Sequence, residues 1–453
     1  MSEANSETFV FKTPIGDCEI PFNREKIMDF LQEVGQGAEN RKTVFGEETA
    51  EFLGITLGNE DEEYEWWEQN HVPSLLYDLN QFIESEYEGF RLTNYNRKGT
   101  NHSAVVKKNL DYPHGKESVV IKGTYYLENK DGLKFVLTLN PVEGLNIEVR
   151  ISYDSSVCSP SDFIQPFMQY HHTKGILKNS SFNSKMEFLK YDEKNWEDIV
   201  LTENQRKKID RNIAKFVENM EKFKSRELPL SRGILVVGPP GTGKTLLCNT
   251  IMSQTECTFI YITSESVSNR GDISDMYDLA RSLSPSIIVV EDIDTLGAGD
   301  REQYGGDHPL LGEFLNCLAG IEKNEQVITI ATTNYPQHLD KALVDRPGRF
   351  DVRIDFGLPD ETLRETIFKR YLKNIVHEKI SFSKLIKITE GMSGAHLKEI
   401  VIMAYMEGLE ENNYDENFKL RNNLLFKKAE RMKENRSKYK FHEETEERYE
   451  MHN

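Results

Sequence analysis

Residues 238–245 read Gly-Pro-Pro-Gly-Thr-Gly-Lys-Thr and match the pattern G-x-x-x-x-G-K-[ST]. The unbroken apolar run from Ile234 to Val237 precedes them and has the length and β-branching of a buried parallel strand. The apolar pattern of residues 246–252 after them indicates a helix. Strand, glycine loop and helix in this order predict a loop that binds phosphate groups through its backbone amides and the helix N-terminus.

Each residue type in this loop has a chemical reason to be there. Glycine lets the backbone form a concave nest of N–H groups, Lys244 brings a full charge to the phosphates, and the Thr245 hydroxyl is a ligand for Mg²⁺. The alternative is a chance match in a glycine-containing turn, which the flanking strand and helix disfavour. We therefore expect a nucleoside triphosphate to bind Gly238, Pro239, Pro240, Gly241, Thr242, Gly243, Lys244, Thr245 and Leu246.

The composition limits the class of protein. A chain of 453 residues suggests two or three domains, and 29% charged residues indicate a soluble, surface-rich protein. The net charge of −19 argues against general binding to nucleic acid or to anionic membranes. No apolar run approaches the roughly 20 residues of a membrane span, and residues 1–12 lack the pattern of a signal peptide. Scattered cysteines without a C-x-x-C pair favour a cytoplasmic location.

Changes in the pattern divide the chain into successive regions. We expect an α+β partner-recognition domain over 1–190 and a P-loop α/β domain over 191–357. A small helical bundle over 358–411 follows, and then a charged, exposed helix and tail over 412–453. The α/β domain is indicated by alternating strands and helices, which are typical of a doubly wound parallel sheet. Its expected strands are 234–237, 258–263, 286–290, 327–332 and 352–356, and a long amphipathic helix over 203–225 precedes them.

The first region has mixed signals and no catalytic motif that we recognise. Helical periodicity covers 24–34 and 73–90, whereas strands are expected over 119–126, 135–139 and 146–152, with a hairpin turn at 130–132. His171 and His172 offer half of a metal site, but a solvated or core-edge pair is the preferred interpretation. Trp66 and Trp67 offer a partner-docking surface, although ordinary packing is preferred.

Polar side chains follow two of the expected strands. Glu291 and Asp292 come at the end of the strand over 286–290, and Asn334 follows the strand over 327–332. The carboxyl ends of parallel strands meet beside the phosphate loop, where acids hold Mg²⁺ and polarise water. Arg346 and Arg349 follow shortly after. Two such arginines are often surface ion-pair partners, but their place just after the Asn334 strand favours a role in phosphate chemistry.

The loop GPPGTGKT, the strand IIVVEDID and the segments ITIATTN and ALVDRPGRF occur in an order and spacing that resemble an AAA-type ATPase of the AAA+ superfamily. The resemblance covers about residues 191–410. It implies a P-loop AAA+ parallel sheet with a helical lid, hydrolysis of ATP with Mg²⁺, and a homo-oligomeric ring that is usually a hexamer.

The resemblance also assigns roles to positions. Residues 238–245 match the Walker A loop, and Glu291 and Asp292 fall at the Walker B acids, with Glu291 and Thr245 holding the metal. Asn334 matches sensor 1, and Arg346 and Arg349 match the arginine fingers that act on the neighbouring subunit's ATP. Asp198 and Ile199 match the entry segment that contacts adenine. Gly394 and Ala395 match the lid motif near the ribose and phosphates.

Two features depart from the family pattern. The family's usual acid order is Asp then Glu, whereas this chain has Glu291 then Asp292, as in the AAA subgroup of the mitochondrial Rieske-protein translocase. By position, the shorter Asp292 is then the residue that orients the water. Slow hydrolysis is the resulting hypothesis. Residues 264–272 contain no aromatic residue where AAA unfoldases carry one, so threading by aromatic residues at this place is not indicated. The glycine-rich loop over 297–308 is an alternative pore-facing segment.

These observations support one leading function and one alternative. The leading hypothesis is an ATP-driven machine that remodels or translocates a protein partner bound by the N-terminal domain. The alternative is a nucleotide-switched oligomeric scaffold with slow turnover. A nucleic-acid translocase is disfavoured by the acidic composition, and no H-E-x-x-H string of a fused zinc peptidase follows the ATPase region.

Overall fold

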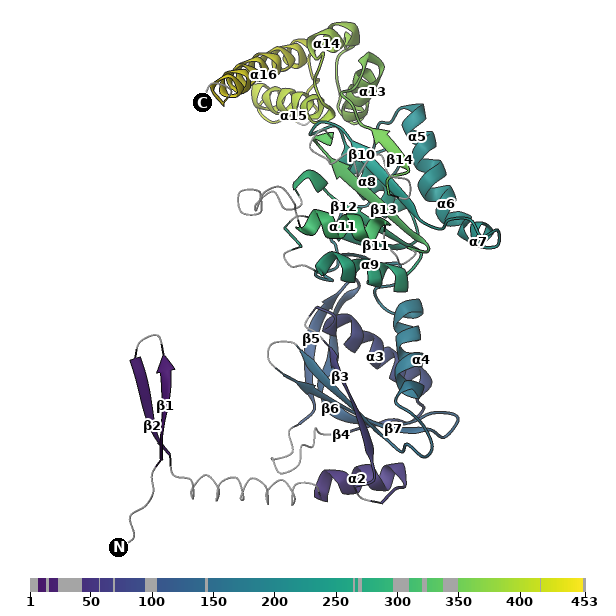
Figure 1. The fold of residues 1–453 in the computed structure, drawn as a ribbon. Coiled ribbons are helices and arrows are strands. Elements are labelled where there is room, and N and C mark those ends of the chain that lie inside the picture. Colours follow the sequence, from purple (N-terminus) through teal and green to yellow (C-terminus); the bar gives the residue numbers. More distant parts are fainter. Residues whose placement is uncertain are drawn as a thin grey trace. The chain divides into compact units, whose positions relative to one another are not determined.

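The computed structural model describes residues 7–13, 16–22, 43–56, 58–67, 70–93, 104–142, 146–263, 265–267, 271–295, 309–319, 324–336, 349–415 and 417–450. The chain divides into two compact units, Met1–Ile176 and Leu177–Asn453, which run from purple to blue and from teal to yellow in Figure 1. The helix expected over 24–34 and the loop over 297–308 lie outside the described residues.

The first unit is built on an antiparallel sheet with the strand order β3-β8-β7-β6-β4, to which β5 adds by pairing with β6. Its strands are β3 (Asp61–Trp67), β4 (Arg91–Thr93), β5 (Val106–Tyr112), β6 (Gly115–Glu128), β7 (Lys134–Pro141) and β8 (Ile147–Tyr153), and a separate hairpin joins β1 (Glu7–Thr13) to β2 (Gly16–Phe22). The turn between β6 and β7 lies where the sequence predicts it. Gly132 adopts a φ of 79° there, and its N–H donates to the Asn129 carbonyl at 3.0 Å.

Three helices accompany this sheet: α2 (Thr43–Leu53), α3 (Val72–Glu86) and α4 (Ser161–Lys174). Aromatic rings fill the space between α3, α4 and the sheet, with Phe82 and Phe167 at a centroid distance of 5.6 Å. Trp67 stacks on Phe167 at 5.8 Å, whereas Trp66 is 61% exposed. The packing interpretation therefore holds for Trp67, and Trp66 lies on the surface.

His171 is a core residue paired with an acid. Its Nδ1 lies 2.5 Å from Oδ2 of Asp78, and both side chains are buried. The other carboxylate oxygen of Asp78 accepts the Ile176 N–H at 2.8 Å. Burial raises the pKa of Asp78, while the bonds to His171 and to Ile176 oppose that shift. Among the described residues no group of three or more His, Cys, Asp or Glu is arranged to hold a metal ion.

We expect Asp78→Ala to destabilise the first unit strongly. The substitution removes Asp78 as the acceptor for a buried imidazole and for the partly buried Ile176 N–H, which should cost about 3 kcal/mol of unfolding free energy. Urea unfolding followed by circular dichroism measures this loss. Asp111→Ala is the control because Asp111 is exposed and pairs with Lys116 at 3.8 Å, so it should cost about 0.5 kcal/mol or less. Equal losses in the two variants would contradict the assignment.

The second unit is built on a parallel sheet with the strand order β14-β10-β13-β12-β11-β9. The strands are β9 (Ser181–Asn183), β10 (Arg232–Val237), β11 (Thr258–Ile262), β12 (Ser286–Val290), β13 (Val327–Thr333) and β14 (Val352–Asp355). The predicted α/β parallel sheet is confirmed, and each strand expected from the sequence is present. Strand β10, which leads into the phosphate loop, pairs with β13 on one side and β14 on the other. Its carboxyl end therefore opens at a change in strand order, where ligands bind in such sheets.

Strand β9 extends the parallel sheet beyond the expected strands. It pairs with β11, with Ser181 opposite Phe259, and so forms one edge of the sheet. Residues 177–190, which the sequence places with the first region, thus lie in the second unit. Strand β9 does not stand out in the sequence, because it has only three residues and the buried Phe182 is flanked by the polar Ser181 and Asn183.

Helices cover the two faces of the parallel sheet. One face packs Ile234, Ile287 and Ile328 against α8 (Lys244–Gln254) and against the helical segment α5 (Glu203–Ile209), η1 (Asp210–Ala214), α6 (Lys215–Glu218) and α7 (Met220–Lys224). The other face carries α9 (Asp272–Ser282) and α11 (Pro309–Ala319), where the Tyr277 hydroxyl bonds Thr329 on β13 at 3.0 Å. A short 3-10 turn, η2 (Ile293–Thr295), follows β12. Alternate residues of each strand serve the two layers, which accounts for their unbroken apolar character.

The lid consists of α13 (Glu361–Leu372), α14 (Phe382–Ile388), α15 (Gly394–Glu411) and α16 (Asn422–Glu450), drawn in green to yellow in Figure 1. Its core continues past residue 411, where the sequence places the end of the bundle. Leu424, Leu425 and Ala429 of α16 are buried in the same cluster as Leu397 and Val401 of α15. The many charged residues of α16 hide this apolar face in the sequence, and one of them, Lys428, is itself only 8% exposed and pairs with Glu407.

Candidate nucleotide-binding site

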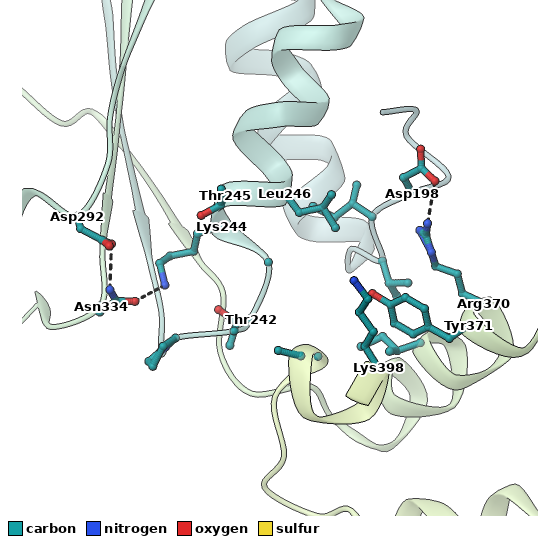
Figure 2. A pocket seen from close by; sticks show the side chains of 18 residues that line it. Asp198, Thr242, Lys244, Thr245, Leu246, Asp292, Asn334, Arg370, Tyr371 and Lys398 are labelled. Atoms are coloured by element: carbon teal, nitrogen blue, oxygen red, sulfur yellow. Dashed lines mark hydrogen bonds and ion pairs between the residues drawn. The ribbon is translucent and has the colours of Figure 1, made fainter. Parts of the chain in front are cut away.

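A cavity of about 370 Å³ opens at the carboxyl end of β10, between the phosphate loop and the lid (Figure 2). Its lining comes from the entry segment, the phosphate loop, the ends of β12 and β13, and the lid helices α13 and α15. The lining residues are Asp198, Ile199, Val200, Pro240, Gly241, Thr242, Gly243, Lys244, Thr245, Leu246, Asp292, Asn334, Ile367, Arg370, Tyr371, Gly394, Ala395 and Lys398.

Most residues that the sequence proposes for nucleotide binding therefore meet in one cavity. Gly238 and Pro239 lie just outside its lining, but their carbonyls accept hydrogen bonds from Lys244 at 2.7 and 3.1 Å. Glu291 and Arg349 are not among the lining residues either. Arg346 lies outside the described residues.

Lys244 begins α8 and is 6% exposed. Besides the two loop carbonyls, its Nζ donates to Oδ1 of Asn334 at 2.6 Å. A buried ammonium group needs such acceptors, because unpaired burial of a charge is costly. Burial lowers the pKa of Lys244, and the carboxylates beside it oppose the shift. The lysine thus links the phosphate loop to the end of β13.

Asn334 in turn contacts the acid that follows β12. Its Nδ2 donates to Oδ1 of Asp292 at 2.9 Å, so that Lys244, Asn334 and Asp292 form one hydrogen-bonded chain (Figure 2). Asp292 has a φ of 47°, a left-handed backbone that Asp tolerates better than most residues. Its backbone N–H is bound by the Thr332 hydroxyl at 3.0 Å. This unusual backbone turns the Asp292 carboxylate into the cavity.

The electrostatics at Asp292 favour its role as a proton acceptor. Burial raises the pKa of Asp292, and the carboxylates of Glu291 and Asp294 raise it further. Lys244 and Asn334 oppose that shift. A carboxylate with a raised pKa is a stronger base than an ordinary aspartate, which is the property needed to accept a proton from water.

Glu291, the residue before Asp292, contacts Thr245. The Thr245 hydroxyl donates to Oε1 of Glu291. A hydroxyl and a carboxylate oxygen side by side are hard oxygen donors of the type that Mg²⁺ prefers. These two residues therefore fit the metal that the sequence expects, and Asp292 is left to face the cavity.

The opposite end of the cavity is formed by the entry segment and α13. The Asp198 carboxylate accepts from Arg370 at 2.7 Å, and Arg370 also donates to the Glu197 carbonyl at 2.7 Å. The Asn195 N–H and Arg370 lower the pKa of Asp198. Figure 2 shows Arg370 and Tyr371 projecting from α13 toward this end. Asp198 thus fixes the backbone of the entry segment, and the ring of Tyr371 lines the cavity while also packing against the lid core.

Sequence reasoning missed several lining residues. Val200 follows the expected pair Asp198 and Ile199 directly, whereas Ile367, Arg370 and Lys398 lie on lid helices where no motif marks them. Their common signal is their spacing on a helix. Ile367 and Arg370 are three residues apart on α13, and Lys398 lies one turn after Gly394 on α15, so each pair shares a face.

Arg349 has a structural role within its own chain. It is 7% exposed, and its backbone packs against β10 so closely that a Cβ at Gly233 would lie 1.6 Å from its carbonyl oxygen. The side chain of Arg349 is therefore largely enclosed by this chain's own fold. A substitution there is expected to disturb the fold, so Arg346 is the better position for testing an intersubunit role.

The comparisons with known proteins agree with this geometry. The profile of the family described as "ATPase family associated with various cellular activities (AAA)" matches residues 234–358. The proteasome-activating nucleotidase of Methanopyrus kandleri is 30% identical over 310 residues, which are 65% of this chain and 68% of that protein. The ATP-dependent zinc metalloprotease FtsH of Metamycoplasma arthritidis is 30% identical over 266 residues, 56% of this chain and 35% of that protein.

A third relative is the 26S proteasome regulatory subunit 6A of Encephalitozoon cuniculi, 33% identical over 225 residues, which cover 47% of this chain and 56% of that protein. The fold and the cavity define a P-loop nucleotide-binding protein with a helical lid. The comparisons place it further: this chain belongs to the AAA family and is an ATP-hydrolysing enzyme. Among the helices of the described residues, none has the length and apolar character needed to cross a membrane.

We expect Gly241→Ala to weaken ATP binding about tenfold or more. Gly241 has a φ of 74°, and an added Cβ would lie 2.9 Å from both the Ala395 Cβ and the Ser393 Oγ. Backbone strain of about 1–3 kcal/mol would then fall on the loop that contacts phosphate. Titration with a fluorescent ATP analogue measures the loss. Gly357→Ala is the control, since nothing lies within 4 Å of its added Cβ. Unchanged affinity in Gly241→Ala would contradict the close contact between loop and lid.

Proposed function

We propose that this ATPase works as a cytoplasmic homo-oligomeric ring, most simply a hexamer, that remodels or translocates a protein partner bound through its first unit. The observation that carries the proposal is the hydrogen-bonded chain from Lys244 through Asn334 to Asp292. It joins the phosphate-binding lysine to a carboxylate with a raised pKa inside the cavity. A protein that merely holds nucleotide does not need this arrangement.

In this proposal each part of the cavity has a task. Lys244 and the loop amides bind the phosphates, and Thr245 and Glu291 hold Mg²⁺, which supplies charge stabilisation on the phosphate oxygens. Asp292 and Asn334 orient the attacking water. The adenine is placed by Asp198 and Ile199, and the ribose and phosphates by Gly394 and Ala395.

A protein partner is favoured by the relatives and by the charge of the chain. The names of the relatives connect nucleotide use with proteasomes and proteolysis, so proteins are the class of substrate to test first. The net charge of −19 disfavours nucleic acid. Strand β3 of the first unit exposes Trp66 and Tyr64, and exposed aromatic side chains suit a recognition role.

A ring follows from the arginine fingers that the sequence proposes. Arg346 would act on the ATP of a neighbouring subunit, which requires a head-to-tail interface that closes. Arg349, which is enclosed by its own chain, would position the Arg346 segment. Activity should therefore depend on residues from two copies of the chain.

Mixing two inactive variants tests this sharing of sites. We expect Asp292→Asn and Arg346→Ala each to lose nearly all ATP hydrolysis alone. In an equal mixture about a quarter of the interfaces join an intact Asp292 to an intact Arg346, so part of the activity should return. Steady-state phosphate release after co-assembly measures it. A mixture as inactive as its components would contradict action in trans, and a mixture of Asp292→Asn with Lys244→Ala is the control, because both lesions lie in the same site.

The alternative is an ATP-switched scaffold with slow turnover. The order Glu291 then Asp292 supports it, since the shorter aspartate reaches less far toward a water than a glutamate would. In such a scaffold, ATP binding would set the oligomeric state and hydrolysis would be incidental.

Asp292→Asn separates the two functions. We expect it to keep ATP binding and assembly while turnover falls about 100-fold or more, because the amide cannot accept a proton. Phosphate release and light scattering after size exclusion report the two properties together. A wild-type protein that assembles with ATP but turns over no faster than the variant would favour the scaffold. If the wild type is active and Asp292→Asn hydrolyses ATP at the same rate, Asp292 does not take part in hydrolysis.

A further inference from the structure

The C-terminal helix α16 reaches back to the start of α15. Nη1 of Arg436 donates to the carbonyl of Gly391 at 2.7 Å. Gly391 has a φ of 72° and lies in the turn that connects α14 to α15. A hydrogen bond from a charged donor is stronger than a neutral one, so this contact fixes the turn relative to α16.

The same turn is organised by a cap on α15. The side chain of Ser393 lies at the N-cap, and Nδ1 of His396 accepts the Ser393 N–H at 3.3 Å and bonds the Ser393 hydroxyl at 2.6 Å. Nδ1 accepts the N–H bond only when it carries no proton. Burial, and then the charge of Arg436, lower the pKa of His396, which favours that neutral form. Arg436 therefore supports the cap as well as the turn.

The capped turn touches the phosphate loop directly. The Ala395 N–H donates to the Gly241 carbonyl at 3.0 Å. Gly394 and Ala395 line the nucleotide cavity on the lid side, and Gly241 lines it on the loop side. A shift of the turn would thus move two walls of the cavity relative to one another.

We infer that Arg436 is a positioning residue for nucleotide binding, which holds the turn of residues 391–395 against the phosphate loop and so couples α16 to ATP affinity. The inference rests on the nucleotide site proposed above and names a regulator of it. Arg436 does not line the cavity, so it acts through the turn. Anything that displaces α16, whether a neighbouring subunit or a partner, would then weaken nucleotide binding without touching the nucleotide.

The test compares arginines on one helix. Arg436→Met removes the bond to Gly391, whereas Arg431→Met removes the same charge from an exposed position on α16. We expect Arg436→Met to raise the Kd for a fluorescent ATP analogue and the KM for ATP about tenfold, with kcat at saturation nearly unchanged. Arg431→Met should behave as the wild type. Arg436→Lys, which keeps a cationic donor, should recover most of the affinity.

Several outcomes would overturn the inference. Equal affinities in Arg436→Met and wild type would do so, and so would equal weakening by the substitutions at Arg436 and Arg431. A drop in melting temperature that accounts for the loss of binding, with no recovery in Arg436→Lys, would show that Arg436 only stabilises the fold. Lys244→Ala is the reference for the site itself. If the wild type binds the ATP analogue no better than Lys244→Ala does, the proposed nucleotide site itself is wrong, and the inference about Arg436 falls with it.

Discussion

The buried ammonium group of Lys244 is the constraint on which the rest of the site depends. A charge this enclosed must be surrounded by acceptors, and the fold supplies them from different parts of the chain. Two loop carbonyls come from the end of β10, and the amide of Asn334 comes from the end of β13. These strands are neighbours in the parallel sheet, so their register fixes the distance between the lysine and the amide. Phosphate binding would exchange these acceptors for charged ones, which make stronger bonds with an ammonium group.

The lid completes a cavity that the sheet alone leaves open. Its first helix reaches the entry segment through Arg370 and Asp198, and α15 reaches the phosphate loop through Ala395. The lid therefore touches the cavity at two places, one at each end. Helices α13 and α15 share one apolar core, so a single packed unit holds both contacts. The packing of the lid thus belongs to the site as much as the motif residues do.

The fold of the half of the chain that carries the motifs could be predicted well, because each motif there fits one arrangement of strand, loop and helix. An apolar run before a glycine loop is typical of a buried strand, and acids after such a run lie at its carboxyl end. The sequence therefore places Lys244, Asp292 and Asn334 at one edge of the sheet, where they form one hydrogen-bonded chain. The pairing of Asp198 with Arg370 could not be predicted in this way. It joins residues far apart in sequence, and neither residue type is unusual at its position.

Other failures have equally specific causes. Strand β3 has the sequence Asp-Glu-Glu-Tyr-Glu-Trp-Trp, whose carboxylates hide the alternation of an edge strand. Lysines and arginines on α16 likewise conceal Leu424 and Leu425, which are buried. In α16 long charged side chains surround a narrow apolar stripe, so composition indicates solvent exposure although one face is covered. Helix–helix packing and strand pairing decide such cases, and neither is visible in a single sequence.

Strand β9 protects one edge of the parallel sheet in the ATPase unit. Its pairing with β11 covers the row of backbone groups that β11 would otherwise present to solvent. At the opposite edge, the side chains of Gln205 and Lys208 donate to the carbonyls of Asp355 and Arg353 on β14, at 2.6 and 2.9 Å. Uncovered strand edges recruit other strands and lead to aggregation. A fragment that starts at residue 191, where composition suggests that the ATPase region begins, would lack β9. Strand β11 would then expose its unpaired backbone groups and favour aggregation.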